Sequence, residues 1–189
     1  IAAVIIATGL VQSGLYVLQL IVAGRALYRD PPARRPALLW RRYGDLAPPI
    51  TLIAPAYNKA LTIEDSVRSL LSLRYPSVEV MVVNDGSTDD TLEILIEAFD
   101  LKPITRAHDL KLQHQPIRTL YGAADHPHLF VVDKANGGKA DALNAGINMS
   151  RAPVVCSIDA DSILESDALL RAVRPFIDEP KRMIAVGGT

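Results

Sequence analysis

The first 24 residues of the chain, Ile1 to Gly24, contain no charged side chain. A helix of 24 residues is roughly 36 Å long, which exceeds the hydrocarbon core of a bilayer, about 30 Å thick. A secretory signal peptide is the alternative, but it would have a basic leading segment and a shorter apolar run. A buried core helix rarely extends so far without a charge. We therefore predict that residues 1–24 form one transmembrane helix.

Arginine and proline are concentrated in the next segment, residues 25–49, where six arginines stand against two aspartates and five prolines occur. An excess of arginine beside a membrane span is typical of the cytoplasmic side. Closely spaced prolines favour an extended linker over a packed element. We predict a cytoplasmic tether over residues 25–49, at the inner (plasma) membrane, with the domain that follows in the cytoplasm.

From residue 50 to residue 189, short apolar runs alternate with longer segments of helical periodicity. The short runs predict strands, which cover 50–54, 78–83, 117–121, 129–132, 154–158 and 183–186. The periodic segments predict helices, which cover 63–71, 88–99, 139–149 and 166–177. Residues 100–116 are polar and irregular. Alternation of this kind predicts an α/β fold with a mostly parallel sheet and flanking helices.

Composition narrows the class of protein. Hydrophobic residues make up 49% of the chain and charged residues 22%, which excludes a disordered protein. Its net charge of −1 argues against a partner made of nucleic acid, since such binders carry a basic excess. One cysteine, Cys156, excludes an internal disulfide.

Acidic residues follow two of the predicted strands. Asp85 comes after the strand at 78–83, while Asp159 and Asp161 come after the strand at 154–158. In parallel sheets, ligands bind outside the carboxyl ends of the strands, so these carboxylates should share one edge. Carboxylates gathered in this way need a cation or hydrogen-bond donors. A spaced pair of aspartates suits Mg²⁺ or Mn²⁺, which keep open positions for water and substrate phosphates. Taken by itself, Asp85 also fits a turn residue before Gly86.

A glycine-rich segment precedes the predicted helix at 139–149, and reads Asn136-Gly137-Gly138-Lys139-Ala140. Backbone N–H groups at such a helix start, together with a lysine, can bind phosphate. It is not a Walker A loop, because Asp133 stands where the first glycine is needed and Ala140 replaces the serine or threonine. A tight turn with a solvated lysine is the alternative.

Together these segments resemble glycosyltransferase family 2, whose members are inverting enzymes with the GT-A (Rossmann-like) fold that use nucleotide-diphospho sugars. The matching segments occur in order along the chain: Ile53–Asn58, Val82–Asp89, Asn136–Asn144 and Ile158–Asp161. The preceding apolar segment and the Gly-Lys-Ala stretch are most similar to membrane-embedded synthases of poly-N-acetylglucosamine, hyaluronan and cellulose. The resemblance implies that residues 50–189 are the nucleotide-sugar-binding part of a glycosyltransferase domain.

By this resemblance, Asp85 binds the uracil or ribose, Lys139 lies near the phosphates, and Asp159 holds the ribose and pyrophosphate side. The residues implied to bind the nucleotide sugar are Pro55, Tyr57, Asn58, Asp85, Lys139 and Asp159. Asp161, together with Asp159, is implied to ligate the divalent ion.

The resemblance further implies a UDP-sugar donor such as UDP-GlcNAc or UDP-glucose, a saccharide or lipid-linked acceptor, and polysaccharide as the product. An accessory subunit is a further partner to test for. Family members often have Glu after the asparagine of the first motif, where this chain has Lys59. Their catalytic base belongs to a later motif, which we expect beyond Thr189; Asp141 and Glu165 are the first candidates should it lie within this chain.

Two other interpretations remain open at this point. A phosphohydrolase of the haloacid-dehalogenase type also carries Asp-x-Asp after a strand, with the first aspartate as nucleophile. That motif lies at the start of its domain, whereas 108 residues separate Ile50 from Ile158 here. A non-catalytic nucleotide-sugar-binding or regulatory membrane subunit would need the same donor residues without the chemistry.

Overall fold

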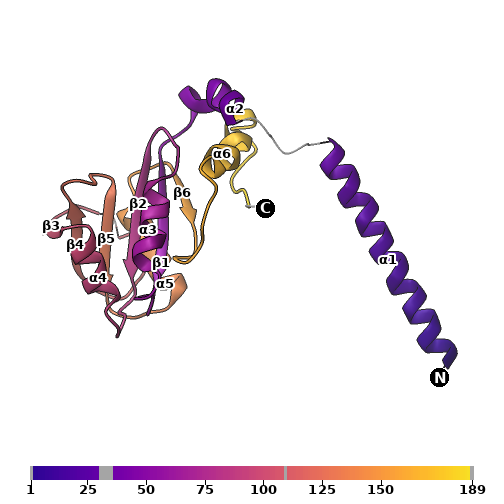
Figure 1. Cartoon of the computed structure of the whole chain (residues 1–189), viewed down its shortest axis with the longest axis horizontal. Coiled ribbons are helices and arrows are strands. Elements are labelled where there is room, and N and C mark those ends of the chain that lie inside the picture. The colour runs from indigo at the N-terminus through magenta and orange to yellow at the C-terminus, as the bar shows by residue number, and fades with distance from the viewer. Residues whose placement is uncertain (1, 30–35, 109, 188–189) are drawn as a thin grey trace. The chain divides into compact units, whose positions relative to one another are not determined.

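A computed structural model describes residues 2–29, 36–108 and 110–187 of the chain (Figure 1). It divides the chain into two compact units, Ile1–Ala37 and Leu38–Thr189. The described part of the first unit is dominated by one helix, α1 (Ala2–Arg29). Within α1, the segment Ile6–Arg25 is long and apolar enough to cross a membrane, and its side chains are exposed. The helix therefore extends beyond the predicted limit at residue 24.

The part of the predicted tether that belongs to the second unit is folded. Helix α2 (Pro36–Tyr43) is followed by the short 3₁₀ helix η1 (Gly44–Leu46). Leu39 and Tyr43 are buried, and the Tyr43 hydroxyl donates to both carboxylate oxygens of Asp178 at 3.2 Å. Apolar residues among the arginines thus attach residues 38–46 to the domain, a packing that proline and charge content alone do not predict.

A six-stranded sheet forms the centre of the second unit, in the order β3-β4-β5-β2-β1-β6. Its strands are β1 (Ile50–Ala56), β2 (Val78–Asn84), β3 (Leu101–Ile104), β4 (Ile117–Ala123), β5 (Leu129–Lys134) and β6 (Val154–Ser157). The four strands β6, β1, β2 and β5 are parallel, while β4 runs antiparallel to β5 and β3 antiparallel to β4. The prediction of a mostly parallel sheet is confirmed.

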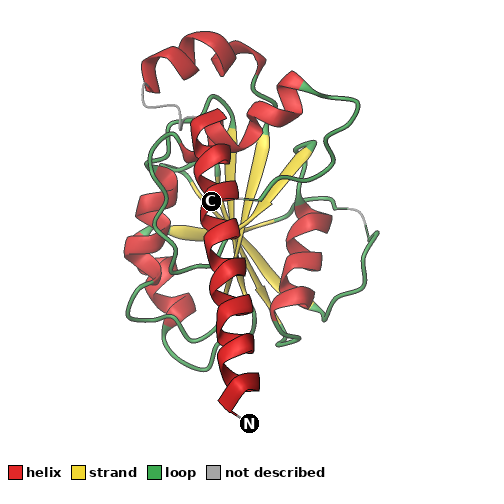
Figure 2. Cartoon of the chain, turned by 90° about the vertical axis from the view of Figure 1, so that its right-hand side faces the viewer, coloured by secondary structure: helices red, strands yellow, loops and turns green. Residues whose placement is uncertain are grey.

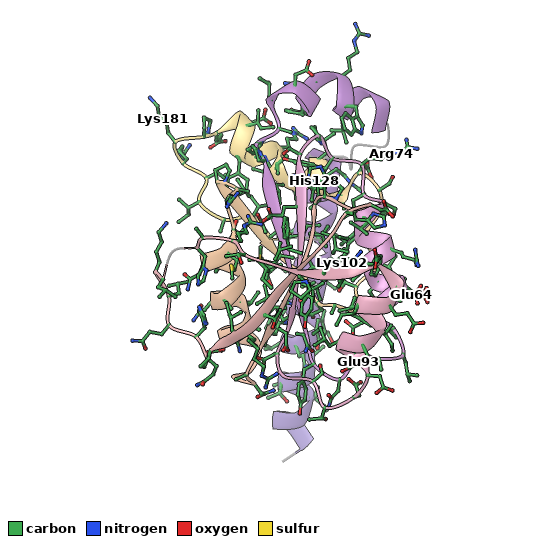
Figure 3. The ribbon with its side chains drawn as sticks, turned by 90° about the vertical axis from the view of Figure 1, so that its left-hand side faces the viewer. Glu64, Arg74, Glu93, Lys102, His128 and Lys181 are labelled. Carbon is green, nitrogen blue, oxygen red and sulfur yellow. The ribbon has the colours of Figure 1, made fainter. Side chains whose placement is uncertain are left out.

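Four helices of this unit follow the strands: α3 (Ile63–Leu71), α4 (Thr91–Ala98), α5 (Lys139–Met149) and α6 (Ala168–Asp178). Helices flank the strands on both sides (Figure 2). Helix α5 packs on β1 and β2, whereas α3 packs on α4 and β2. The outer face of α4 is polar, and Glu93 is exposed on it (Figure 3). The predicted bounds of α5 and α3 match those observed.

The strand predictions failed in three places. Residues Leu101–Ile104, predicted as irregular, form the edge strand β3. Residues 183–186, predicted as a strand, have no strand partner in the described structure. Strand β6 ends at Ser157 and its residues alternate between exposed and partly buried, so it is a sheet edge and not a buried strand. Short edge strands have few apolar neighbours, which makes their sequence pattern weak.

An apolar cluster joins α5 to the sheet. It contains Ile53, Met81, Val83, Leu120, Val132, Ala142, Ala145 and Met149. Gly146 of α5 lies close against the sheet, because a Cβ there would lie 2.5 Å from Cγ2 of Ile53. The small side chains of α5 therefore allow the helix to lie directly on β1.

We predict that Gly146→Ala destabilises the domain by about 1–3 kcal/mol, because the added methyl group overlaps the buried Ile53 side chain. Alanine is the better helix former, so a gain in stability would contradict the close approach. Urea unfolding measures the change. In an Ile53→Ala background the same substitution should cost less, since the overlapping atoms are gone.

Candidate functional site

The carboxyl ends of the four parallel strands border one cleft of about 490 Å³. Each strand delivers its following segment to this edge, as expected for an open α/β sheet. The lining residues are Pro55, Ala56, Tyr57, Lys59, Asp85, Asn136, Gly138, Lys139, Asp159, Ala160 and Asp161. Segments that lie more than 100 residues apart in the sequence thus meet in one site.

Asp85 is a buried carboxylate at the base of the cleft, and donors surround it. Lys134 Nζ lies 2.5 Å from its Oδ1, the Gly137 N–H donates to Oδ1 at 3.1 Å, and the Gly138 N–H donates to Oδ2 at 2.7 Å. Asn136 Nδ2 donates to the Asp85 carbonyl at 2.8 Å. These bonds hold the carboxylate in one orientation and join the end of β2 to the start of α5.

Lys134, the last residue of β5, is fully buried and has three acceptors. Besides Asp85, its ammonium lies 2.5 Å from Oδ1 of Asp141 and donates to the Ala135 carbonyl at 2.6 Å. Asp141 also accepts from the Gln115 N–H at 2.9 Å. Burial would raise the pKa of Asp141, but the bonds from Lys134 and Gln115 outweigh it and hold that pKa below its usual range. Asp141 is therefore ionised and engaged at neutral pH.

Two glycines let the backbone come this close. Gly86 has φ +66°, and a Cβ there would lie 2.7 Å from the backbone nitrogen of Asn136. At Gly137, a Cβ would lie 2.4 Å from the carboxyl carbon of Asp141. Each glycine is required because backbone or carboxylate occupies the space that a side chain would need.

The two aspartates after β6 are exposed in the cleft, and each is paired with a lysine. Lys139 Nζ bonds Oδ1 of Asp159, and Lys59 Nζ lies 2.8 Å from Oδ2 of Asp161. The hydrogen bond from Lys59 and its positive charge lower the pKa of Asp161, and the same bond together with the negative charge of Asp161 raises the pKa of Lys59. The edge thus presents carboxylate oxygens and ammonium groups side by side.

The loop after β1 is fixed by the loop after β2. Asn58 has φ +52°; its Oδ1 accepts from the Thr88 N–H at 2.8 Å, and its N–H donates to Ser87 Oγ at 3.0 Å. The Lys59 N–H donates to Thr91 Oγ1 at 2.8 Å. Asn58 therefore shapes the loop, while the half-exposed ring of Tyr57 faces the cleft.

Asp159 and Asp161 are the residues that could hold a metal ion. In the parts of the chain that the structure describes, no group of three or more His, Cys, Asp and Glu side chains is arranged around one point. Two hard oxygen donors beside an open cleft nevertheless fit Mg²⁺ or Mn²⁺, which take their remaining ligands from water and from substrate phosphates.

The structure brings together most of the residues singled out from the sequence. Pro55, Tyr57, Asp85, Lys139, Asp159 and Asp161 line the cleft. Asn58, Asp141 and Glu165 are absent from the described lining, and Glu165 pairs with Arg171.

Lys134 was assigned no role in the sequence analysis. Lys134 ends β5, two residues after the apolar run 129–132, and a lysine buried at the end of a core strand needs an acid partner; that was the signal available.

Comparison with known proteins agrees with this geometry. Residues 51–188 match the family described as glycosyl transferase family 2. The chain is 34% identical over 132 residues to poly-beta-1,6-N-acetyl-D-glucosamine synthase of Staphylococcus epidermidis, a match that covers 70% of this chain and 26% of that protein. The chain thus spans about a quarter of the length of the synthases that it matches.

Two solved structures share the fold. The mannosyltransferase PcManGT of Pyrobaculum calidifontis, in complex with GDP-Man and Mn²⁺, has a TM-score of 0.55 and 25% identity, over 76% of this chain and 40% of that one. TarS of S. aureus, in complex with UDP-GlcNAc, has a TM-score of 0.50 and 26% identity, over 69% and 31%. The sheet is therefore of the GT-A type, and the chain belongs to glycosyl transferase family 2.

Proposed function

We propose that this chain is the donor-binding part of an inverting glycosyltransferase for polysaccharide synthesis. The donor is a nucleotide-diphospho sugar, a UDP-sugar such as UDP-GlcNAc or UDP-glucose, bound with Mg²⁺ or Mn²⁺. The observation that carries the proposal is the convergence of Asp85, Lys139, Asp159 and Asp161 on one cleft. The synthases at 30–34% identity and the UDP-GlcNAc complex of TarS support the choice of donor.

Nucleoside recognition is assigned to the side of the cleft formed by the ends of β1 and β2. The Tyr57 ring offers an aromatic face on which a base can stack. Asp85 is pre-oriented by Lys134 and by two backbone N–H groups, so its carboxylate can accept a further hydrogen bond from the nucleoside without reorganisation. The buried network thus makes Asp85 a rigid acceptor.

Phosphate recognition is assigned to the opposite side, around Lys139 and the two aspartates after β6. In the reaction, the bond between the anomeric carbon and the diphosphate oxygen breaks while an acceptor oxygen bonds that carbon and loses its proton to a base. Lys139 would stabilise the negative charge that develops on the diphosphate. Asp159 and Asp161 would hold the divalent ion, which when bound supplies further positive charge there.

Membrane attachment through α1 completes the proposal. The helix is long and apolar enough to span a bilayer, and the arginine excess over residues 25–42 favours the cytoplasmic side for that end. Nucleotide sugars are used on that side. A saccharide or lipid-linked acceptor and an accessory subunit are the partners to be sought.

Membership of glycosyl transferase family 2 leaves a haloacid-dehalogenase-type phosphohydrolase without support. In the structure, Asp159 is paired with Lys139 and shares its cleft with Asp85, a residue for which that chemistry has no use. A non-catalytic nucleotide-sugar-binding subunit would have the same cleft. A measurement of sugar transfer to an acceptor distinguishes such a subunit from a glycosyltransferase.

We predict that UDP binds with higher affinity in the presence of MnCl₂, and that Asp161→Asn lowers the metal-dependent affinity by about tenfold or more. Calorimetry with UDP, with and without MnCl₂, measures both effects. Glu93→Gln makes the same chemical change on the exposed face of α4 and should leave the affinity unchanged. Metal-independent binding of UDP, or full affinity in Asp161→Asn, would contradict the metal role.

We predict that Asp85→Ala weakens UDP binding by about 1–3 kcal/mol, the value of one buried polar contact. Asp141→Ala is the matched control, because it removes the other carboxylate of Lys134 and leaves Asp85 in place. Both variants should lower the melting temperature, but only Asp85→Ala should lower UDP affinity strongly. Equal losses of affinity would show that Asp85 acts only through the buried network.

We predict that the domain lies in the cytoplasm. Green fluorescent protein fused after Thr189 should fluoresce in bacterial cells, and alkaline phosphatase at the same position should be inactive, since each reporter works on one side of the membrane only. Active phosphatase with a dark fluorescent fusion would reverse the topology. If both fusion proteins were recovered in the soluble fraction, this would show that α1 does not anchor the chain in the membrane.

A further inference from the structure

Of the two lysines that line the cleft in the described structure, Lys59 has no task in the proposed function, and it stands where family members often carry Glu. Its ammonium lies 2.8 Å from Oδ2 of Asp161, and both side chains are partly exposed in the cleft. The contact joins the loop after β1 to the loop after β6, across 102 residues of sequence. An ammonium group therefore occupies an oxygen of the carboxylate to which we assign the divalent ion.

The position of Lys59 is imposed by its backbone. The Lys59 N–H donates to Thr91 Oγ1, and the next N–H, that of Ala60, donates to Asp89 Oδ2 at 3.1 Å. Asp89 is held in turn by Thr91, which donates to it through both its N–H and its hydroxyl. Only the flexible stem of Lys59 is free to swing, so the ammonium stays within reach of the cleft whichever partner it has.

We propose that Lys59 is a built-in counter-ion of Asp161 that a divalent cation must displace, and that the released ammonium then binds the diphosphate of the donor. The inference rests on the proposed function and adds a coupling between its two ligands. Lys59 thus competes with the cation for Asp161 and, once displaced, is a binding residue for the phosphates.

The coupling follows from charge. A divalent cation at Asp161 repels an ammonium a few ångströms away, so the cation binds weakly while Lys59 has no other anion to contact. A nucleoside diphosphate supplies that anion, because its phosphate oxygens are strong acceptors for an ammonium. Each ligand thereby relieves the cost of binding the other. By linkage, UDP must then strengthen Mn²⁺ binding by the same factor by which Mn²⁺ strengthens UDP binding.

The test measures Mn²⁺ binding by the chain in detergent micelles, from the electron paramagnetic resonance signal of free Mn²⁺, with and without UDP. Lys59→Met removes the charge and keeps the length of the side chain, whereas Lys59→Arg keeps the charge. Lys102→Met is the matched control, because Lys102 forms an exposed pair with Asp100 at 2.9 Å and lies on β3, outside the donor cleft (Figure 3).

Without UDP, Lys59→Met should bind Mn²⁺ about tenfold more tightly than the unmodified chain, because the competing ammonium is gone. The factor by which UDP strengthens Mn²⁺ binding should fall about threefold or more in the same variant. Lys59→Arg and Lys102→Met should behave like the unmodified chain, and thermal melts should show that all variants are folded.

Equal Mn²⁺ affinity in Lys59→Met and Lys102→Met would overturn the inference and leave the proposed function intact, provided that the unmodified chain binds Mn²⁺ and UDP. An unchanged coupling factor in Lys59→Met would also overturn it. If the unmodified chain binds neither Mn²⁺ nor UDP, the proposed function and this inference fail together.

Discussion

The site depends on the ion pairs that the buried ammonium of Lys134 forms with Asp85 and Asp141. Moving a charge out of water is costly, and this lysine is fully buried, so its position is stable only because two carboxylates and a carbonyl accept from it. Its partners Asp85 and Asp141 come from the end of β2 and the first turn of α5. One ammonium group thereby ties two adjacent parallel strands to the helix that packs on them.

The same constraint shapes the surface of the cleft. Lys134 holds the Asp85 carboxylate, which also accepts hydrogen bonds from the Gly137 and Gly138 N–H groups. These bonds fix the backbone just before α5, which starts at Lys139. The side chain of Lys139 then lies beside Asp159 at the end of β6. The exposed, adaptable pairs of the cleft are thus built on a buried network that cannot rearrange cheaply. Rigid support beneath adjustable side chains suits a site whose surface must adapt to a ligand.

How far the sequence predicts this structure depends on the strength of the local pattern. The bounds of α5 and the positions of the central parallel strands β1, β2 and β5 were predictable, because their apolar residues face a large core. The cleft residues were predictable because parallel strands end at one edge. Strand β3 was missed because three of its four residues are exposed, so it lacks an apolar repeat.

Side-chain partners were harder to predict than elements. Asn58 belongs to the first motif, yet its side-chain oxygen accepts a hydrogen bond from the Thr88 N–H and so shapes the loop. Its backbone is left-handed, a conformation that asparagine adopts more readily than most residues. The pairing of Lys134 depends on which strand lies next to β5, and that neighbour is β2, about 50 residues earlier in the chain. Local periodicity carries no information about such a neighbour. Only the sheet order reveals it.

Charge balance at the cleft has a consequence for how ligands arrive. In the described structure, the cleft and the buried network beneath it pair Lys59, Lys134 and Lys139 with Asp85, Asp141, Asp159 and Asp161. Opposite charges a few ångströms apart cancel beyond about one Debye length, about 8 Å at physiological salt. An approaching anion therefore feels little net attraction until it is close to contact. These paired charges therefore add little long-range attraction for an anion, and selection among anions depends on the contacts made within the cleft.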